Sequence, residues 1–66
     1  MESNTRIQSL GKIEEFCELN EDFSFSLEDH LVFIYIYGRI VSSFSLRIFG
    51  PETVGNLLTY IKGKFQ

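Results

Sequence analysis

Few side chains in this sequence are suited to nucleophilic or metal chemistry. Cys17 is the one cysteine and His30 the one histidine, so a structural zinc site would lack the soft ligands it needs. Cys17 also falls on the apolar side of a helical pattern, where a thiol is typically an inert core residue. His30 follows Asp29 in a predicted turn, where such a neighbouring pair usually lies on the surface without catalytic consequence. We therefore predict neither a metal site nor a cofactor.

Catalytic motifs are absent from the sequence as well. No serine has the glycine-framed elbow of a hydrolase nucleophile, and no glycine-rich segment could cradle a phosphate. The carboxylates of Glu14, Glu15 and Glu18 have the spacing of a helix surface, which differs from a buried acid pair with separated pKa values. The sequence therefore predicts a protein that is not an enzyme.

The acidic residues are concentrated in one part of the chain. The net charge is −3, and eight of the nine acids lie within residues 1–29. One interpretation is a solvated surface that favours solubility. The alternative is an acidic surface that imitates a row of phosphates and blocks a nucleic-acid-binding protein. The residues of this acidic surface are Glu14, Glu15, Glu18, Glu21, Asp22, Glu28 and Asp29.

Direct binding of nucleic acid is a third and weaker hypothesis. The six lysines and arginines form no basic stripe, and the chain as a whole is acidic. The sheet aromatics that could stack on bases are assigned to the helix-facing side in the register described below. The contacts of such a binder would be Arg39, Arg47, Lys62 and Lys64.

Two amphipathic helices flank the middle of the chain. Thr5 and Gln8 fit a capping box, which predicts a helix over about 6–19 after a flexible tail at 1–4. Its apolar positions recur every three or four residues. They are Ile7, Leu10, Ile13, Phe16 and Cys17. Pro51 suits the first position of a second helix over about 51–62, whose apolar face is Val54, Leu57, Leu58 and Ile61.

Three strands are predicted between the helices. Residues 23–27 alternate between apolar residues and serine, and 31–37 form an uncharged run rich in β-branched and aromatic residues. Residues 28–30 are then a three-residue connection, and Gly38-Arg39 fits a two-residue type II′ hairpin turn. The third strand follows from Ile40. This order predicts an α+β fold: helix, three-stranded antiparallel meander, helix, with both helices on one face of the sheet.

Counting outward from these turns assigns every strand residue to a face. The helix-facing side receives Phe23, Phe25, Leu27, Leu31, Phe33, Tyr35, Tyr37, Ile40, Phe44, Leu46 and Ile48. The opposite side receives an apolar stripe from the middle strand, flanked by serines. We predict the partner interface there, at Val32, Ile34, Ile36, Val41, Ser43, Ser45 and Arg47. An apolar patch of this kind marks an interaction site, unless the register is off or a helix crosses to that side.

The sequence as a whole predicts a single small domain over 1–66 that binds another protein. We expect a regulatory protein of the inhibitor or adaptor type, such as those of phages and mobile elements. It would act through the open sheet face or an edge strand, and would itself form a homodimer. We expect no membrane association, because no apolar run approaches the length of a span and the first residues do not resemble a signal peptide. A cytoplasmic location is the expectation that follows.

Overall fold

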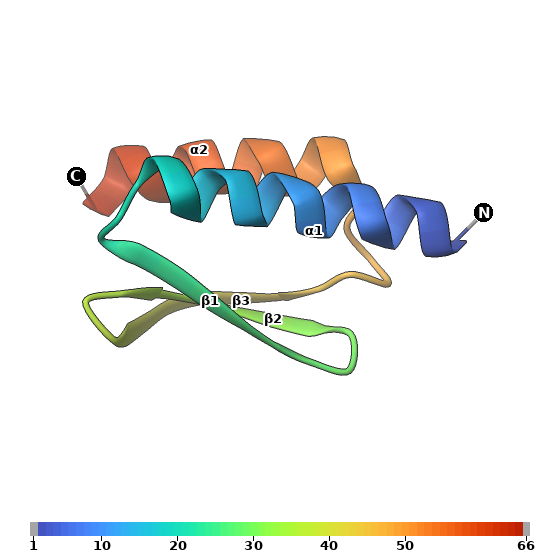
Figure 1. Cartoon of the computed structure of the whole chain (residues 1–66), viewed down its shortest axis with the longest axis horizontal. Coiled ribbons are helices and arrows are strands. Elements are labelled where there is room, and N and C mark those ends of the chain that lie inside the picture. Colours follow the sequence, from blue (N-terminus) through green and yellow to red (C-terminus); the bar gives the residue numbers. More distant parts are fainter. Residues whose placement is uncertain (1, 66) are drawn as a thin grey trace.

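A computed structural model shows two helices packed on one face of a three-stranded antiparallel sheet (Figure 1). The structure describes residues 2–65, with side chains from residue 5 onward. The elements are α1 (Glu2–Leu19), β1 (Phe23–Glu28), β2 (Leu31–Ile36), β3 (Arg39–Ser45) and α2 (Pro51–Phe65), and the sheet order is β1-β2-β3. The predicted fold, helix, meander and helix, is confirmed.

The two helices run parallel to each other, because each element reverses the direction of the one before it (Figure 1). Both helices therefore end at the same end of the molecule, above the turn between β2 and β3. The turn between β1 and β2 lies at the other end, below the start of α1.

Helix α1 begins earlier than predicted. It starts at Glu2, so Thr5 lies inside the helix and the predicted tail is wrong for residues 2–4, while Met1 lies outside the described residues. Ile13 is buried and Leu10, Phe16 and Cys17 pack against the core, as their spacing predicted. Ile7 is instead 65% exposed.

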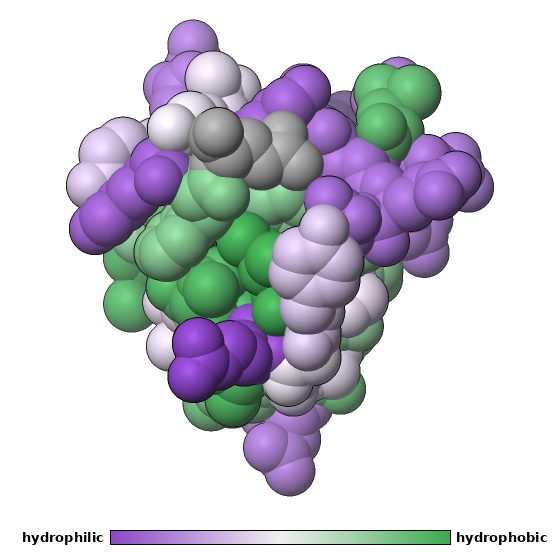
Figure 2. All heavy atoms as spheres, turned by 90° about the vertical axis from the view of Figure 1, so that its left-hand side faces the viewer, coloured by the Kyte–Doolittle hydropathy of each residue, from purple (hydrophilic) through white to green (hydrophobic). Residues whose placement is uncertain are grey.

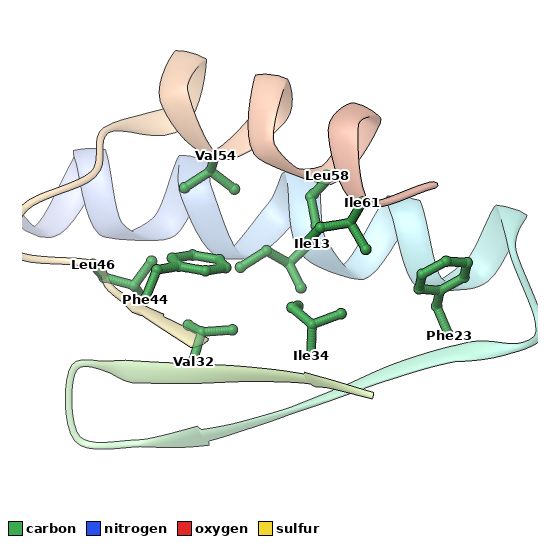
Figure 3. Close-up of a cluster of buried hydrophobic side chains, with 9 residues drawn as sticks. All are labelled: Ile13, Phe23, Val32, Ile34, Phe44, Leu46, Val54, Leu58 and Ile61. Carbon is green, nitrogen blue, oxygen red and sulfur yellow. The ribbon is translucent and has the colours of Figure 1, made fainter. Parts of the chain in front are cut away.

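Helix α2 begins at Pro51, as predicted, and continues past the predicted end to Phe65. Its first turn is closed by the N–H of Val54, which donates to the carbonyl of Gly50 (2.9 Å). Val54, Leu58 and Ile61 are buried, and they face the side chains that rise from the sheet (Figure 3). The core therefore lies between the helix layer and one side of the sheet.

Both predicted hairpin registers are wrong. The register of β1 and β2 is off by one residue, and that of β2 and β3 by two residues beside the turn and by one residue beyond Val41. Glu28 pairs with Leu31 and Ile36 pairs with Arg39, so each connection is a two-residue turn. In the second turn Tyr37 and Gly38 both have positive φ, of 52° and 81°. That is a type I′ turn, with glycine at the second central position, and its twist matches the twist of the strands.

The change of register turns β2 over, because a slip of one residue exchanges the faces of a strand. Val32 and Ile34 are 0% exposed and point at the helices (Figure 3), and Ile36 packs against the same core. The prediction that these three residues lie on an open face is therefore wrong. Leu31, Phe33 and Tyr35 occupy the open face in their place.

β1 and the second half of β3 keep their predicted orientation, whereas Ile40, predicted on the helix-facing side, lies on the open face. Phe23, Phe44 and Leu46 are buried on the helix side, as the alternation of apolar residues and serine indicated. In β3 one extra residue interrupts the ladder, since Ile34 pairs with Ser42 whereas Tyr35 pairs with Ile40. This β-bulge turns Val41 toward the core, so the prediction that places Val41 on the open face is also wrong.

Candidate functional site

The side of the sheet that faces away from the helices is not covered by any element of the chain between residues 2 and 65 (Figure 1). We call it the open face. Its central strand supplies an apolar and aromatic row, and the outer strands supply mostly serine. The register assigns to it Leu31, Phe33, Tyr35, Ser24, Ser26, Glu28, Ile40, Ser43 and Ser45. Leu31 is 38% and Ile40 59% exposed, so the apolar side chains of the open face are accessible to solvent.

The aromatic residues of the open face are partly held by their neighbours. Phe33 pairs with Ser26 on β1 and with Ser43 on β3, so it lies at the centre of the face. The hydroxyl of Tyr35 lies 3.0 Å from Oγ of Ser26 and shares a hydrogen bond with it. This bond satisfies the polar atom of Tyr35. The centre of the open face is therefore apolar and aromatic, and its polar side chains come from the outer strands.

Of the predicted interface residues, some lie on the open face and some do not. Ser43 and Ser45 flank the middle strand there, as predicted. Arg47 follows β3 and is exposed. The four apolar members of the set were placed by the wrong register, and they form part of the core or pack against it. They are Val32, Ile34, Ile36 and Val41.

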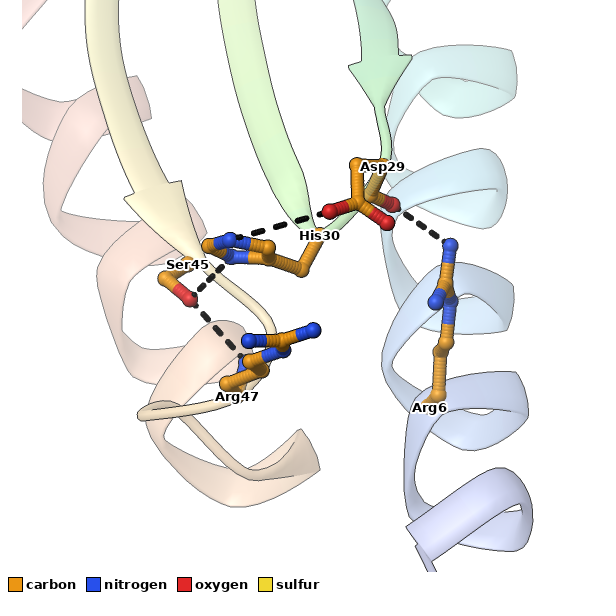
Figure 4. A network of polar contacts seen from close by, with 5 residues as sticks. All are labelled: Arg6, Asp29, His30, Ser45 and Arg47. Atoms are coloured by element: carbon orange, nitrogen blue, oxygen red, sulfur yellow. Dashed lines mark hydrogen bonds and ion pairs between the residues drawn. The ribbon is translucent and has the colours of Figure 1, made fainter.

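A polar cluster joins three segments beside the turn between β1 and β2 (Figure 4). Nδ1 of His30 lies 2.8 Å from Oγ of Ser45, which also accepts a hydrogen bond from the backbone N–H of Arg47 (3.1 Å). The guanidinium of Arg6 donates to the carbonyl of Asp29 (2.6 Å). No local sequence pattern indicates the contact of Arg6 with Asp29 or that of His30 with Ser45, since they join residues 23 and 15 positions apart.

This cluster contains the residue types of a serine hydrolase, but its geometry favours a structural role. Oδ2 of Asp29 lies 3.9 Å from Nε2 of His30, which is too long for a hydrogen bond that would orient the ring. Asp29 itself has a positive φ of 59° in the turn. The contacts therefore tie the turn to α1 and to the end of β3.

The predicted acidic surface is divided in the structure. Glu14, Glu15 and Glu18 are exposed on α1, and Glu21 and Asp22 follow at its end. Glu28 and Asp29 lie at the far end of β1, which is six residues long and therefore spans about 20 Å. The seven acids therefore form two separate groups, one along the second half of α1 and just after it, and the other at the turn between β1 and β2.

Asp22 has a specific role in the first of these groups. Its backbone carbonyl accepts a hydrogen bond from the N–H of Tyr37 (3.1 Å). Its carboxylate accepts a hydrogen bond from the Tyr37 hydroxyl, and this bond, together with the negative charge, raises the pKa of Tyr37 above its ordinary value of 10.0. Asp22 thus holds the turn that sets the register of β2 and β3.

The basic residues are also divided. Arg39 begins β3 and pairs with Ile36 on the helix-facing side, Arg47 follows the end of β3, and Lys62 and Lys64 lie on α2 in the helix layer. The ammonium of Lys64 lies 5.8 Å from the ring centre of Tyr60 and 5.7 Å from that of Phe65. The four residues predicted for nucleic-acid contact therefore do not form one surface.

Two further features lie away from the open face. A groove of about 400 Å³ between the helices is lined by Lys12, Glu15, Phe16, Leu19, Asn20, Gly55, Leu58, Thr59 and Lys62. At the end where both helices finish, apolar surface gathers in a hollow bordered by polar side chains (Figure 2).

Burial raises the pKa of the Cys17 thiol, so this half-buried side chain is a poor nucleophile.

Comparison with protein-family models, with curated proteins and with solved structures finds no match to this chain. Among residues 2–65, neither helix combines the length and the apolar character needed to cross a bilayer. In the same residues, no three side chains of His, Cys, Asp or Glu group together in a way that could hold a metal ion.

Proposed function

We propose that this chain is a non-enzymatic protein-binding module whose binding surface is the open face. The observation that supports this proposal is the row of Leu31, Phe33 and Tyr35 on a sheet side without cover, with Ile40 beside it. Exposed apolar side chains that form a contiguous patch typically mark an interaction site. The serines around them would supply a polar rim, as is usual for an interface.

The dimensions of the open face indicate the kind of partner. Three strands of about six residues form a plane of about 20 by 14 Å. This area fits the apolar side of one helix, whose diameter is about 10 Å. It is too small for a face-to-face homodimer, because stable interfaces bury about 800 Å² on each partner. The proposed partner is therefore a protein that presents one amphipathic helix, bound weakly enough for a regulatory exchange.

The biological setting belongs to the same proposal. An adaptor or inhibitor of this kind needs only a binding surface and no catalytic group. A cytoplasmic location fits the free thiol of Cys17, since thiols persist in reducing compartments. An acidic mimic is a weaker proposal, because its acids would have to act from two groups about 20 Å apart.

The test compares capture of host proteins by three forms of the chain. The wild type is set against a Phe33→Ser/Ile40→Ser double variant, and Tyr60→Ser, which removes an apolar side chain that is 62% exposed on α2, is the control. We expect a host protein that binds the wild type and the control and is lost with the double variant. In the reconstituted complex, hydrogen exchange should slow in β2 and β3. Capture that is unaffected by the double variant, or protection confined to the helices, would contradict the proposal.

A second candidate function is binding of single-stranded nucleic acid. The observation in its favour is that Phe33 and Tyr35 lie on the open face, where rings can stack on bases, with Arg39 and Arg47 at either end of the adjacent strand. The net charge of −3 opposes it. The measurement is fluorescence anisotropy of a labelled mixed-sequence oligonucleotide at low salt. We expect no binding; binding that is lost in both Phe33→Ser and Arg47→Gln would instead establish this second function.

A further inference from the structure

The two edges of the sheet differ in how they are protected against pairing with another strand. The β3 edge is interrupted by the bulge at Val41 and is flanked by Arg39 and Arg47. Bulges and basic residues are common devices that block edge pairing. The β1 edge, with the sequence Phe-Ser-Phe-Ser-Leu-Glu, has no bulge, no proline and no basic residue. β1 is therefore the unprotected edge of this sheet.

The backbone groups that β1 offers at its edge follow from its pairing with β2. The N–H of Tyr37 donates to the carbonyl of Asp22, so this pair is hydrogen-bonded. Hydrogen-bonded pairs alternate along an antiparallel ladder, which gives the bonds to β2 to residues 24, 26 and 28. The N–H and C=O groups of Phe25 and Leu27 then point outward. Phe23 offers only its carbonyl, because its N–H donates to Asn20 (2.9 Å).

The helix layer leaves the inner side of this edge partly bare. Phe44 of β3 and Leu46 just after it are 6% and 7% exposed, and Phe23 at the start of β1 is 3% exposed, so the helices cover these side chains. On β1, Phe25 is only half-buried and Leu27 is 38% exposed, although both lie on the helix-facing side. The helix layer thus covers the start of β1 at Phe23 and leaves the rest of its inner side partly bare. Apolar side chains therefore remain accessible at the β1 edge, where a second chain with the same layer of helices on a sheet could pack.

We propose that a second copy of this chain pairs with β1, antiparallel and about a twofold axis at Ser26, to form one continuous six-stranded sheet. In this register Phe25 pairs with the partner's Leu27, and the outward backbone groups of both residues are satisfied. The two Ser26 side chains meet at the axis, on the open face.

Charge selects this register over its neighbour. With the axis at Ser26, Asp22 stands opposite the partner's His30, and no two acidic side chains stand directly opposite each other. With the axis moved to Phe25, Asp22 would stand opposite the partner's Glu28, and like charges directly opposite each other destabilise a strand pair. Registers that place odd residues opposite even ones are excluded, because they would oppose helix-facing and open-face side chains.

Dimerisation of this kind goes beyond the proposed function, since it needs no other protein. It also doubles the length over which the open face extends, because the open faces of both copies lie on the same side of the joined sheet. A partner helix, which fits the open face of one copy, would then lie on a wider surface. Self-association itself depends on the β1 edge alone.

The experiment is disulfide trapping of the protein alone, in a Cys17→Ala background that removes the native thiol. The two Cα atoms of residue 26 form a non-hydrogen-bonded pair in the proposed register, at a separation of about 4.5 Å that permits a disulfide. We expect Ser26→Cys to give a covalent species of twice the monomer mass on mild oxidation. Ser43→Cys, an exposed serine on the open face of β3, is the matched control and should stay monomeric.

A second variant measures association without cross-linking. Leu27→Pro removes an outward N–H that β1 does not use within the chain, so the fold should persist while pairing is lost. In sedimentation over a concentration series, we expect the wild type to move from monomer to dimer and Leu27→Pro to remain a monomer. A wild type that is monomeric throughout, or equal trapping of Ser26→Cys and Ser43→Cys, would overturn the dimer. Trapping of Phe25→Cys in preference to Ser26→Cys would overturn the register.

Discussion

The two faces of β2 are both apolar, but only one of them is packed to completion. On the helix side Val32 and Ile34 are 0% exposed, whereas on the open face Leu31 is 38% exposed and Phe33 and Tyr35 are half-buried. The difference follows from what each side chain requires. Branched aliphatic side chains have no polar atom and gain most from full burial, whereas the hydroxyl of Tyr35 needs a partner and finds it in Ser26 on the open face.

This contrast separates stability from binding in a very small domain. Complete burial of a valine or isoleucine side chain stabilises a fold by about 1.5–3 kcal/mol. The apolar area of the open face is still in contact with water. Its burial by a partner would therefore contribute free energy to binding and not to folding. Substitutions on the two faces should therefore affect different measurements.

The largest effect is expected from a charge placed on the packed face. Ile34→Asp removes a fully buried side chain and introduces a carboxylate without a partner, at a cost of about 4 kcal/mol or more. A domain of this size has little stability beyond that. We expect the variant to be unfolded by circular dichroism.

The neighbouring substitution on the open face is the control. Phe33→Asp changes a half-buried side chain on the opposite side, and we expect a loss of about 1 kcal/mol in the free energy of unfolding. The variant should remain folded in denaturant titration. If Ile34→Asp folds and Phe33→Asp does not, the faces of β2 are assigned the wrong way round.

The sequence determined most of the fold but not the face of β2. In β1 and β3 the alternation of Phe, Leu and Ser admits one orientation, so Phe23 and Phe44 could be placed in the core from pattern alone. In β2 both faces are apolar, and the choice depends on which two residues form the turn at Gly38. A tyrosine at φ 52° is uncommon, and the contacts with Asp22 that hold it there are not visible in a local pattern.

Because the turn decides which face is packed, a change at Gly38 is the next strongest test. Gly38 has a φ of 81°, and an added Cβ would meet no atom within 4 Å, so the penalty is conformational. Gly38→Ala should cost about 1–2 kcal/mol in thermal or chemical unfolding. Gly63→Ala lies inside α2, where alanine is favoured by about 1 kcal/mol, and should raise stability. A Gly38→Ala variant as stable as the wild type would exclude the type I′ turn.

The packed side contains one buried polar atom without a hydrogen-bond partner. Removing this atom should raise the stability of the fold instead of lowering it. Ser9 of α1 is 0% exposed, and its hydroxyl has no hydrogen-bond partner among the described residues. An unsatisfied buried hydroxyl costs about 1–3 kcal/mol. Ser9→Ala should therefore raise the free energy of unfolding by about 1 kcal/mol, whereas Ser43→Ala on the open face should change it by less than about 0.5 kcal/mol. A destabilised Ser9→Ala variant would mean that the hydroxyl is bonded.

The smallest effect is expected at Tyr37, where the β2–β3 turn meets the end of α1. Asp22 favours the protonated phenol, so the pKa of Tyr37 is higher in the folded than in the unfolded chain. The stability from this contact is fully present below pH 10.0, the ordinary pKa, and is lost as the pH rises through the folded value. An absorbance titration of tyrosinate should show the shift, and Asp22→Asn should bring the pKa of Tyr37 back toward 10.0. The free energies of unfolding of the wild type and Tyr37→Phe should then differ by a constant amount below that pH and by a changing amount above it. An unchanged titration in Asp22→Asn would show that Asp22 does not hold the turn through its carboxylate, leaving the backbone bond as its one contribution to the register.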